Sequence, residues 1–173
     1  FNHPNATRVF DWDIAQAGWT DQYLDLFSIE QKECLTYFTN QFKKLQPQYS
    51  LFRKTVIHND ANDNNIIVSN DLIDPVVETI IDYGDAAYSQ TINDLAVAIA
   101  YAVMDFPDPL SATLPIISGY HKNFHLKEQE LEALYVLVAI RLVISVTKSA
   151  INKVNEPDNT YLQISDKQAW TLL

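Results

Sequence analysis

The chain has 173 residues, of which 47% are hydrophobic, and its formal net charge is −10. This length and composition predict one domain, residues 1–173, around one buried core. The acidic balance argues against nucleic acid or an anionic membrane as a partner, because their phosphates would repel the protein. Cys34 is the only cysteine, so one chain can form no disulfide, which is typical of the reducing cytoplasm and predicts a cytoplasmic protein.

The first third of the chain is predicted to be mainly helical. Residues 1–17 have no regular pattern, and a short helix is expected over residues 19–27. Ser28 followed by Gln31 has the form of a capping box, which predicts the start of a second helix. The apolar residues of this helix recur at a spacing of three to four, and Pro47 is expected to end it.

Two polar motifs follow, each after a β-branched apolar run. HNDANDNN covers residues 58–65, and IIDYGDAA covers residues 80–87. This pattern predicts short buried strands that deliver carboxylates to one shared edge. A third strand over residues 64–68, followed by a turn, makes the segment between the motifs a hairpin.

The remainder of the chain is predicted to be helical. Residues 92–104 are apolar on nearly all sides, which indicates a buried helix. A second helix is expected from Pro109 through about residue 124, and a third over residues 126–155. Ser165 has the position of the first residue of a last helix.

The helix over residues 126–155 is apolar enough that a membrane span must be considered. Its apolar run, residues 131–146, contains Glu132 and Arg141 and is shorter than the roughly 20 apolar residues that a span needs. A buried helix of a bundle is therefore preferred.

The spacing of the two motifs suits metal chemistry. Asp60 and Asn65 lie five residues apart across a loop, and Asp82 follows seventeen residues later. Two carboxylates and an amide can converge on Mg²⁺, which prefers oxygen ligands and keeps part of its water shell. The order of the residues matches the catalytic loop and the metal-binding Asp-Phe-Gly of protein kinases.

HNDANDNN, DYGD and the NDLA that follows resemble the C-terminal lobe of the aminoglycoside phosphotransferase and choline kinase superfamily. DYGDA and the FDWDIA near the start are most similar to its hydroxylysine kinase and homoserine kinase-like branch. The resemblance implies an α+β fold, the mainly helical C-terminal lobe of a protein-kinase-like protein. Small inserted β-hairpins would carry the catalytic and metal-binding loops.

The resemblance also implies an activity and a set of roles. The protein would move the γ-phosphate of ATP or GTP to the hydroxyl of a small amine or amino acid, of the hydroxylysine, homoserine, choline or aminoglycoside type. Asp60 would be the base, and Asn65 and Asp82 would hold Mg²⁺. His58 would brace the loop, and Asp94 would accept backbone amides of the catalytic loop.

Several residues keep two interpretations. Trp12 and Asp13 could form an aromatic and anionic wall for a substrate ammonium group, or anchor the first segment to the core. Asp85 could meet the ammonium or a second cation, or cap the following turn. Asp63 is an extra ligand or a solvated loop residue, and Asn64 could take a left-handed conformation.

The chain contains three glycines, all isolated, so it lacks a glycine-rich loop to cover a triphosphate. A strand lysine for the α- and β-phosphates is also missing. The nucleotide-binding lobe is therefore expected outside this sequence, and the chain alone is expected to be an inactive fragment. The missing lobe would then be its partner.

Two other functions stay open. In a metal-dependent phosphohydrolase, His58, Asp60, Asp82 and Asp85 would ligate a transition metal, although one histidine makes a poor ligand set for such an ion. The other alternative is a non-catalytic binding domain of a larger protein.

Overall fold

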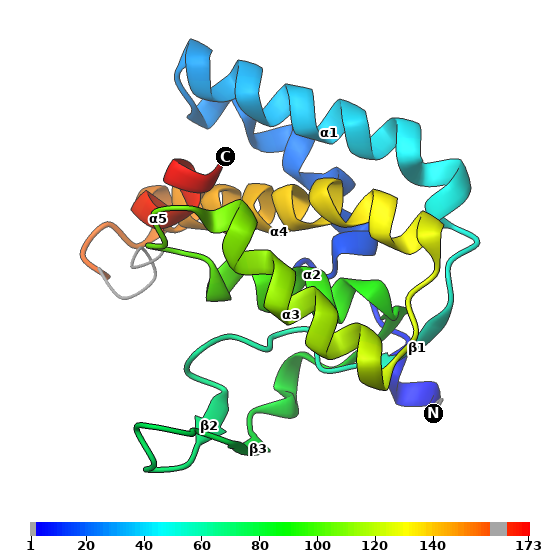
Figure 1. Cartoon of the computed structure of the whole chain (residues 1–173). Coiled ribbons are helices and arrows are strands. Elements are labelled where there is room, and N and C mark those ends of the chain that lie inside the picture. The colour runs from blue at the N-terminus through cyan, green and yellow to red at the C-terminus, as the bar shows by residue number, and fades with distance from the viewer. Residues whose placement is uncertain (1–2, 160–165) are drawn as a thin grey trace.

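The computed structural model describes residues 3–159 and 166–173, most of them in helices (Figure 1). The predicted α+β class is confirmed, because small antiparallel strand pairs interrupt the helices. The elements, with η for a 3-10 helix, are η1 Pro4–Ala6, η2 Ile14–Leu26, α1 Ile29–Tyr49, β1 Lys54–Ile57, β2 Ile66–Val68, β3 Val77–Ile80, η3 Tyr83–Asp85, β4 Ala87–Gln90, α2 Ile92–Ala102, α3 Pro109–Asn123, α4 Glu128–Asn155 and α5 Asp166–Leu172.

Helix α4 is the centre of the core. It contacts α1, α2, α5 and η2, and Figure 1 shows it between α1 on one side and α3 on the other. By length and composition alone α4 could span a membrane, but its most apolar stretch is 67% buried inside the fold. This burial fits the predicted bundle helix. Helix α2, predicted to be buried, has Ile99 and Ala100 at 1% exposure or less.

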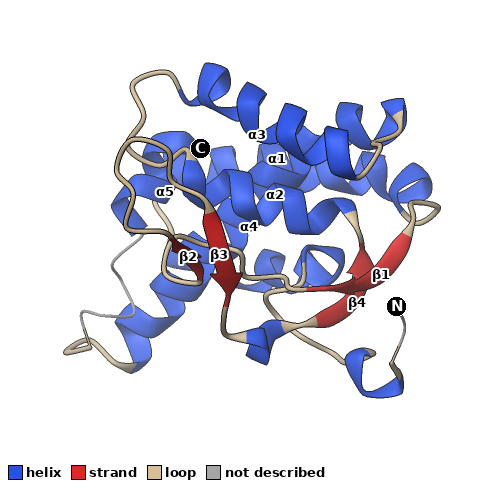
Figure 2. Ribbon diagram, turned by 60° about the horizontal axis from the view of Figure 1, so that its bottom comes forward, coloured by secondary structure: helices blue, strands red, loops and turns tan. Residues whose placement is uncertain are grey.

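The strands form two separate antiparallel pairs, β1 with β4 and β2 with β3 (Figure 2). The predicted hairpin between the motifs is therefore confirmed. Strand β4 was not predicted. Burial was predicted correctly for the end of β1, where Ile57 is 3% exposed, and wrongly for β2 and β3, where Val68 and Val77 are 50% and 61% exposed. Figure 1 shows this hairpin projecting away from the helices, in agreement with the exposure of Val68 and Val77.

The start of α1 is as predicted. The Ser28 hydroxyl accepts a hydrogen bond from the Gln31 N–H, and the Gln31 side chain accepts one from the Ser28 N–H. The predicted end is wrong, because Pro47 lies inside the helix, which continues to Tyr49. Proline removes one backbone donor there, and burial of the Tyr49 side chain at 1% exposure favours the extra half turn.

The boundaries of α2, α3 and α4 lie within about two residues of the prediction, whereas the start of η2 does not. The expected helix over residues 19–27 is a 3-10 helix that begins five residues earlier, at Ile14, because the Asp13 carboxylate accepts from the Ala15 N–H. The last helix is present as α5, whereas the predicted first residue, Ser165, lies outside the described residues.

Candidate active site

The loop after β1 brings Asp60 and Asn65 into direct contact. The Asn65 amide nitrogen donates to the Asp60 carbonyl oxygen and to Asp60 Oδ2, both at 2.9 Å. The Asn62 amide also donates to Asp60 Oδ2, at 3.1 Å. The two residues assigned to the base and to one metal ligand therefore share a hydrogen-bonded loop.

His58 fixes this loop to the second motif. Its Nδ1 accepts from the Asp60 N–H at 3.3 Å, and its Nε2 lies 2.8 Å from the Ile81 carbonyl oxygen. Both bonds are satisfied by a neutral imidazole that carries its proton on Nε2. The Ile81 N–H in turn donates to the Asn65 carbonyl oxygen at 2.9 Å. Asp82 follows Ile81 directly, so the two motifs meet at this point.

Asp82 has an unusual backbone and an exposed side chain. Its φ angle is 59°, in the left-handed region, and its Oδ1 accepts from the Gly84 N–H at 3.2 Å. A Cβ atom added at Gly84 would lie 3.1 Å from that same Oδ1. The glycine therefore lets the carboxylate fold back over the turn.

Asp94, a residue of α2, holds the loop through a hydrogen bond. Its Oδ1 accepts from the N–H of Asn59 at 2.9 Å, and Asn59 is fully buried with a φ angle of 67°. Burial raises the pKa of Asp94 above its ordinary value, although the backbone bonds from Asn59 and His58 oppose the increase. The left-handed residue of the loop is thus Asn59. Asn64, for which that conformation was considered, is not among the described residues with positive φ.

Asp60 is a half-buried carboxylate between opposing charges. Burial raises its pKa, the guanidinium of Arg141 lowers it, and the nearby charge of Asp85 raises it again, with a net increase. Arg141 Nη2 lies 3.1 Å from Asp60 Oδ1. The charge of Asp85 therefore acts on the Asp60 carboxylate. The side chain of Asp63, the other acidic residue considered near the metal, is exposed to solvent.

Trp12 and Asp13 make contacts that correspond to the anchoring interpretation. The ring of Trp12 already faces a cation of the protein, because the Arg141 guanidinium lies 4.7 Å from its centroid. Asp13 is 3% exposed, and its Oδ1 accepts from the Ser89 hydroxyl at 2.6 Å. These bonds tie the segment before η2 to β4.

Arg141 was not among the predicted site residues, although it is in contact with the predicted base, Asp60. The available signal was its place in an apolar run of a helix predicted to be buried, because a buried charge needs a partner. The same reasoning applies to Glu130, which is 1% exposed and accepts from Arg53 Nε at 2.8 Å.

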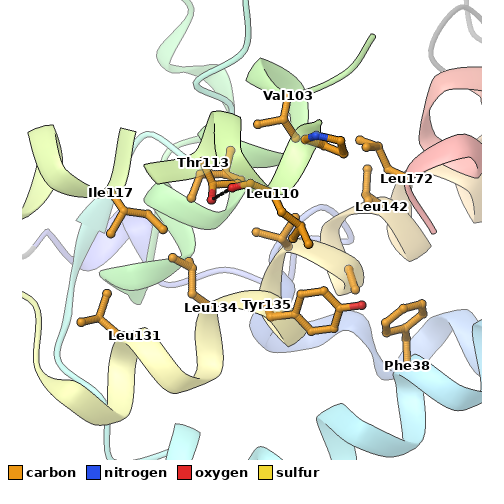
Figure 3. Close-up of a pocket in the computed structure, with 14 residues that line it drawn as sticks. Phe38, Val103, Leu110, Thr113, Ile117, Leu131, Leu134, Tyr135, Leu142 and Leu172 are labelled. Atoms are coloured by element: carbon orange, nitrogen blue, oxygen red, sulfur yellow. Dashed lines mark hydrogen bonds between the residues drawn. The ribbon is translucent and has the colours of Figure 1, made fainter. Parts of the chain in front are cut away.

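An apolar cavity of about 390 Å³ lies elsewhere, between α3 and α4 (Figure 3). No described residue that lines it is charged, and the Thr113 hydroxyl is bonded to the Leu110 carbonyl oxygen at 2.7 Å. A cavity of this kind offers neither a base nor a metal ligand. The polar loops after β1 and β3 are therefore the candidate active site.

The donor set at these loops fits a hard cation. Asn65 and Asp82 would supply oxygen atoms to Mg²⁺, and water and substrate phosphates would complete its coordination. Among the described residues, no group of three or more His, Cys, Asp or Glu could hold a metal ion.

Residues 1–127 match the phosphotransferase enzyme family. The chain belongs to that family. The predicted resemblance to the aminoglycoside phosphotransferase superfamily and to its hydroxylysine kinase branch is thus confirmed. No solved structure matches the chain at a significant level.

Among curated proteins the chain is similar to hydroxylysine kinases. It is 29% identical to the one from Danio rerio over 175 residues, covering 96% of this chain and 49% of the relative. It is 27% identical to that from Mus musculus over 184 residues, covering 98% and 48%. It is also 27% identical to that from Xenopus laevis over 183 residues, covering 98% and 49%. The chain therefore spans about half the length of these relatives.

Proposed function

We propose that the protein containing this chain transfers the γ-phosphate of a nucleoside triphosphate to the hydroxyl of a small hydroxylated amine or amino acid. Hydroxylysine is the first candidate acceptor, because the similar curated proteins are named hydroxylysine kinases. ATP is the first candidate donor and GTP the second.

The proposal depends mainly on one observation, that the backbone of Ile81 forms hydrogen bonds that connect the two motifs. Its N–H donates to the Asn65 carbonyl oxygen, and its carbonyl oxygen lies 2.8 Å from His58 Nε2. This pairing sets Asp82 beside the loop of Asp60 and Asn65. A base and metal ligands on two joined loops suit phosphoryl transfer, which depends on positioning and on neutralisation of charge.

The roles follow from this arrangement. Asp60, half-buried, would accept the proton of the acceptor hydroxyl and orient its oxygen toward the phosphorus. Asn65 and Asp82 would hold Mg²⁺, which neutralises the phosphate oxygens when it is bound. His58 and Asp94 would act as supports of the loop, through the bonds described above.

Asp85 is the candidate for recognition of the substrate ammonium group. Its charge acts on Asp60, so a cation bound at Asp85 would lie within reach of the same loop. We also propose that the nucleotide-binding lobe lies in a part of the protein outside this chain. The three isolated glycines and the doubled length of the relatives support that placement.

The proposed base is tested by Asp60→Asn in the full-length protein, with Asp74→Asn in the exposed β2–β3 turn as the matched control. We expect Asp60→Asn to lower kcat on hydroxylysine by about 10²–10⁴-fold, because a positioned general base contributes that much. The Kd for the nucleotide should stay within about twofold, since Asp60 would touch the acceptor and not the nucleotide. A kcat near that of the parent would refute the role of Asp60.

A further inference from the structure

The guanidinium of Arg141 contacts Asp60 of the candidate active site. The proposed function assigns no role to this arginine. It stands on the central helix α4, 81 residues from Asp60 in sequence, and its side chain is 2% exposed. Burying a charge without a partner is costly, so its contacts indicate why a charged residue is placed there.

Each terminal nitrogen of Arg141 has one partner. Nη2 donates to Asp60 Oδ1 at 3.1 Å, and Nη1 donates to the Trp12 carbonyl oxygen at 2.8 Å. Two aromatic rings pack against the guanidinium, with centroids 4.7 Å away for Trp12 and 5.4 Å away for Tyr101. Together these contacts fix the guanidinium plane, so its bond to Asp60 has a defined direction.

The bonds around Asp60 leave one position open. An ionised carboxylate offers about four lone-pair sites on its two oxygens. Oδ2 accepts from both Asn62 and Asn65, whereas Oδ1 accepts from Arg141 alone among the described residues. The vacant site therefore lies on Oδ1, next to the bond from Arg141.

We propose that Arg141 is a positioning residue of the phosphotransfer site, which orients the Asp60 carboxylate so that Oδ1 receives the proton of the acceptor hydroxyl. This inference rests on the proposed function, because it assumes that Asp60 is the base. Arg141 does not touch the substrate in this account and acts only through Asp60.

The geometry also explains why the residue is an arginine. The two bonds diverge, to a carboxylate of the loop and to a backbone carbonyl before η2, and a planar fork can make both at once. A lysine ammonium at the same position is a single point of charge. It would preserve the ion pair and lose the fixed direction.

The test uses the full-length protein with Arg141→Lys and Arg141→Met, and the control pair Arg53→Lys and Arg53→Met. Arg53 is a matched control because it also pairs with a buried carboxylate, Glu130, and packs on an aromatic ring, with Phe124 at 4.3 Å. It has no contact with Asp60. Melting temperature, kcat and the KM for ATP are measured for each variant.

We expect Arg141→Lys to lower kcat about tenfold and Arg141→Met about a hundredfold, since small misplacements of a catalytic group cost that much. The KM for ATP should stay within about twofold, because Arg141 acts through the base and not the nucleotide. The Arg53 variants should lose thermal stability and keep the parent kcat. Equal loss of kcat in the Arg53 and Arg141 series would overturn the proposal.

A double-mutant cycle gives a second readout that a structural role would not produce. Asp60→Asn combined with Arg141→Lys should be no slower than Asp60→Asn alone, because Arg141 has no base left to orient. Multiplied losses in the double variant would overturn the proposal. If Asp60→Asn is inactive and Arg141→Lys is fully active, the proposed function stands and only this inference fails. A parent with no turnover of any hydroxylated amine removes both.

Discussion

Replacement of Asp94 tests how the catalytic loop is held in place. The Asp94 Oδ1 accepts from the N–H of Asn59, which is fully buried and left-handed. Asp94→Ala would leave this buried donor without an acceptor. An unsatisfied buried donor costs about 1–3 kcal/mol, so we expect a loss of that size in the free energy of unfolding.

Asp94→Asn is the matched control, because asparagine keeps an acceptor oxygen at Oδ1 while it removes the charge and replaces Oδ2 with an amide NH2. Burial already disfavours the ionised form of Asp94, as the raised pKa shows, so loss of the charge should cost little. We expect Asp94→Asn to lose less than half as much stability as Asp94→Ala, on the order of 1 kcal/mol. Urea unfolding of the full-length protein measures both, with kcat as a second readout. Equal losses in the two variants would refute this account of the loop.

Two further predictions concern other parts of the chain. Gly84→Ala places a Cβ 3.1 Å from Asp82 Oδ1, so the carboxylate must move and Mg²⁺-dependent nucleotide binding should weaken about tenfold or more. Gly119→Ala, in α3 with no atom within 4 Å of the new Cβ, should leave binding unchanged and stabilise the helix by about 1 kcal/mol; calorimetry that finds equal effects contradicts this. For Glu130, burial raises the pKa, but the hydrogen bonds from Arg53 and from the Lys127 backbone lower it by a larger amount. The pKa of Glu130 therefore lies below its usual value of 4.5. Its stabilisation is therefore present above about pH 4.5 and lost as the pH falls through its lower folded value. Melting temperatures should show a smaller acid-induced decrease in Glu130→Gln than in the parent, and identical profiles would exclude a role for this pair.

Elements with a local signal could be predicted from the sequence. The capping box at Ser28 and the apolar surface of α2 depend on neighbouring residues, so their patterns give the right structure. The two motifs were likewise readable, because each is a polar cluster that follows a β-branched apolar run, and hydrogen bonds of Ile81 join the two loops.

Features that depend on distant packing could not be predicted. Strand β4 pairs with β1 at a sequence separation of 30 to 36 residues, and no local pattern marks that partner. The exposure of Val77 depends on the absence of a covering helix among the described residues, while its sequence resembles that of a buried strand. The contact between Arg141 and Asp60 crosses 81 residues and depends on how α4 passes under the loop.

The candidate site differs from the prediction mainly at Trp12 and Asp13. Trp12 and Asp13 carried a possible role at the substrate, and the structure gives both of them partners inside the protein. A motif near the start of a chain cannot show whether its aromatic ring faces a ligand or a buried arginine. Only the packing of α4 beside it distinguishes the two.

The proposed kinase moves phosphate to an alcohol and not to water. Full-length protein should be given ATP and Mg²⁺ with either hydroxylysine or lysine, which differ by the one hydroxyl group, and the products separated by mass spectrometry. We expect a phosphorylated amino acid and an equimolar amount of ADP with hydroxylysine, and neither product with lysine. Release of inorganic phosphate at the same rate with both amino acids, without a phosphorylated product, would contradict this proposal.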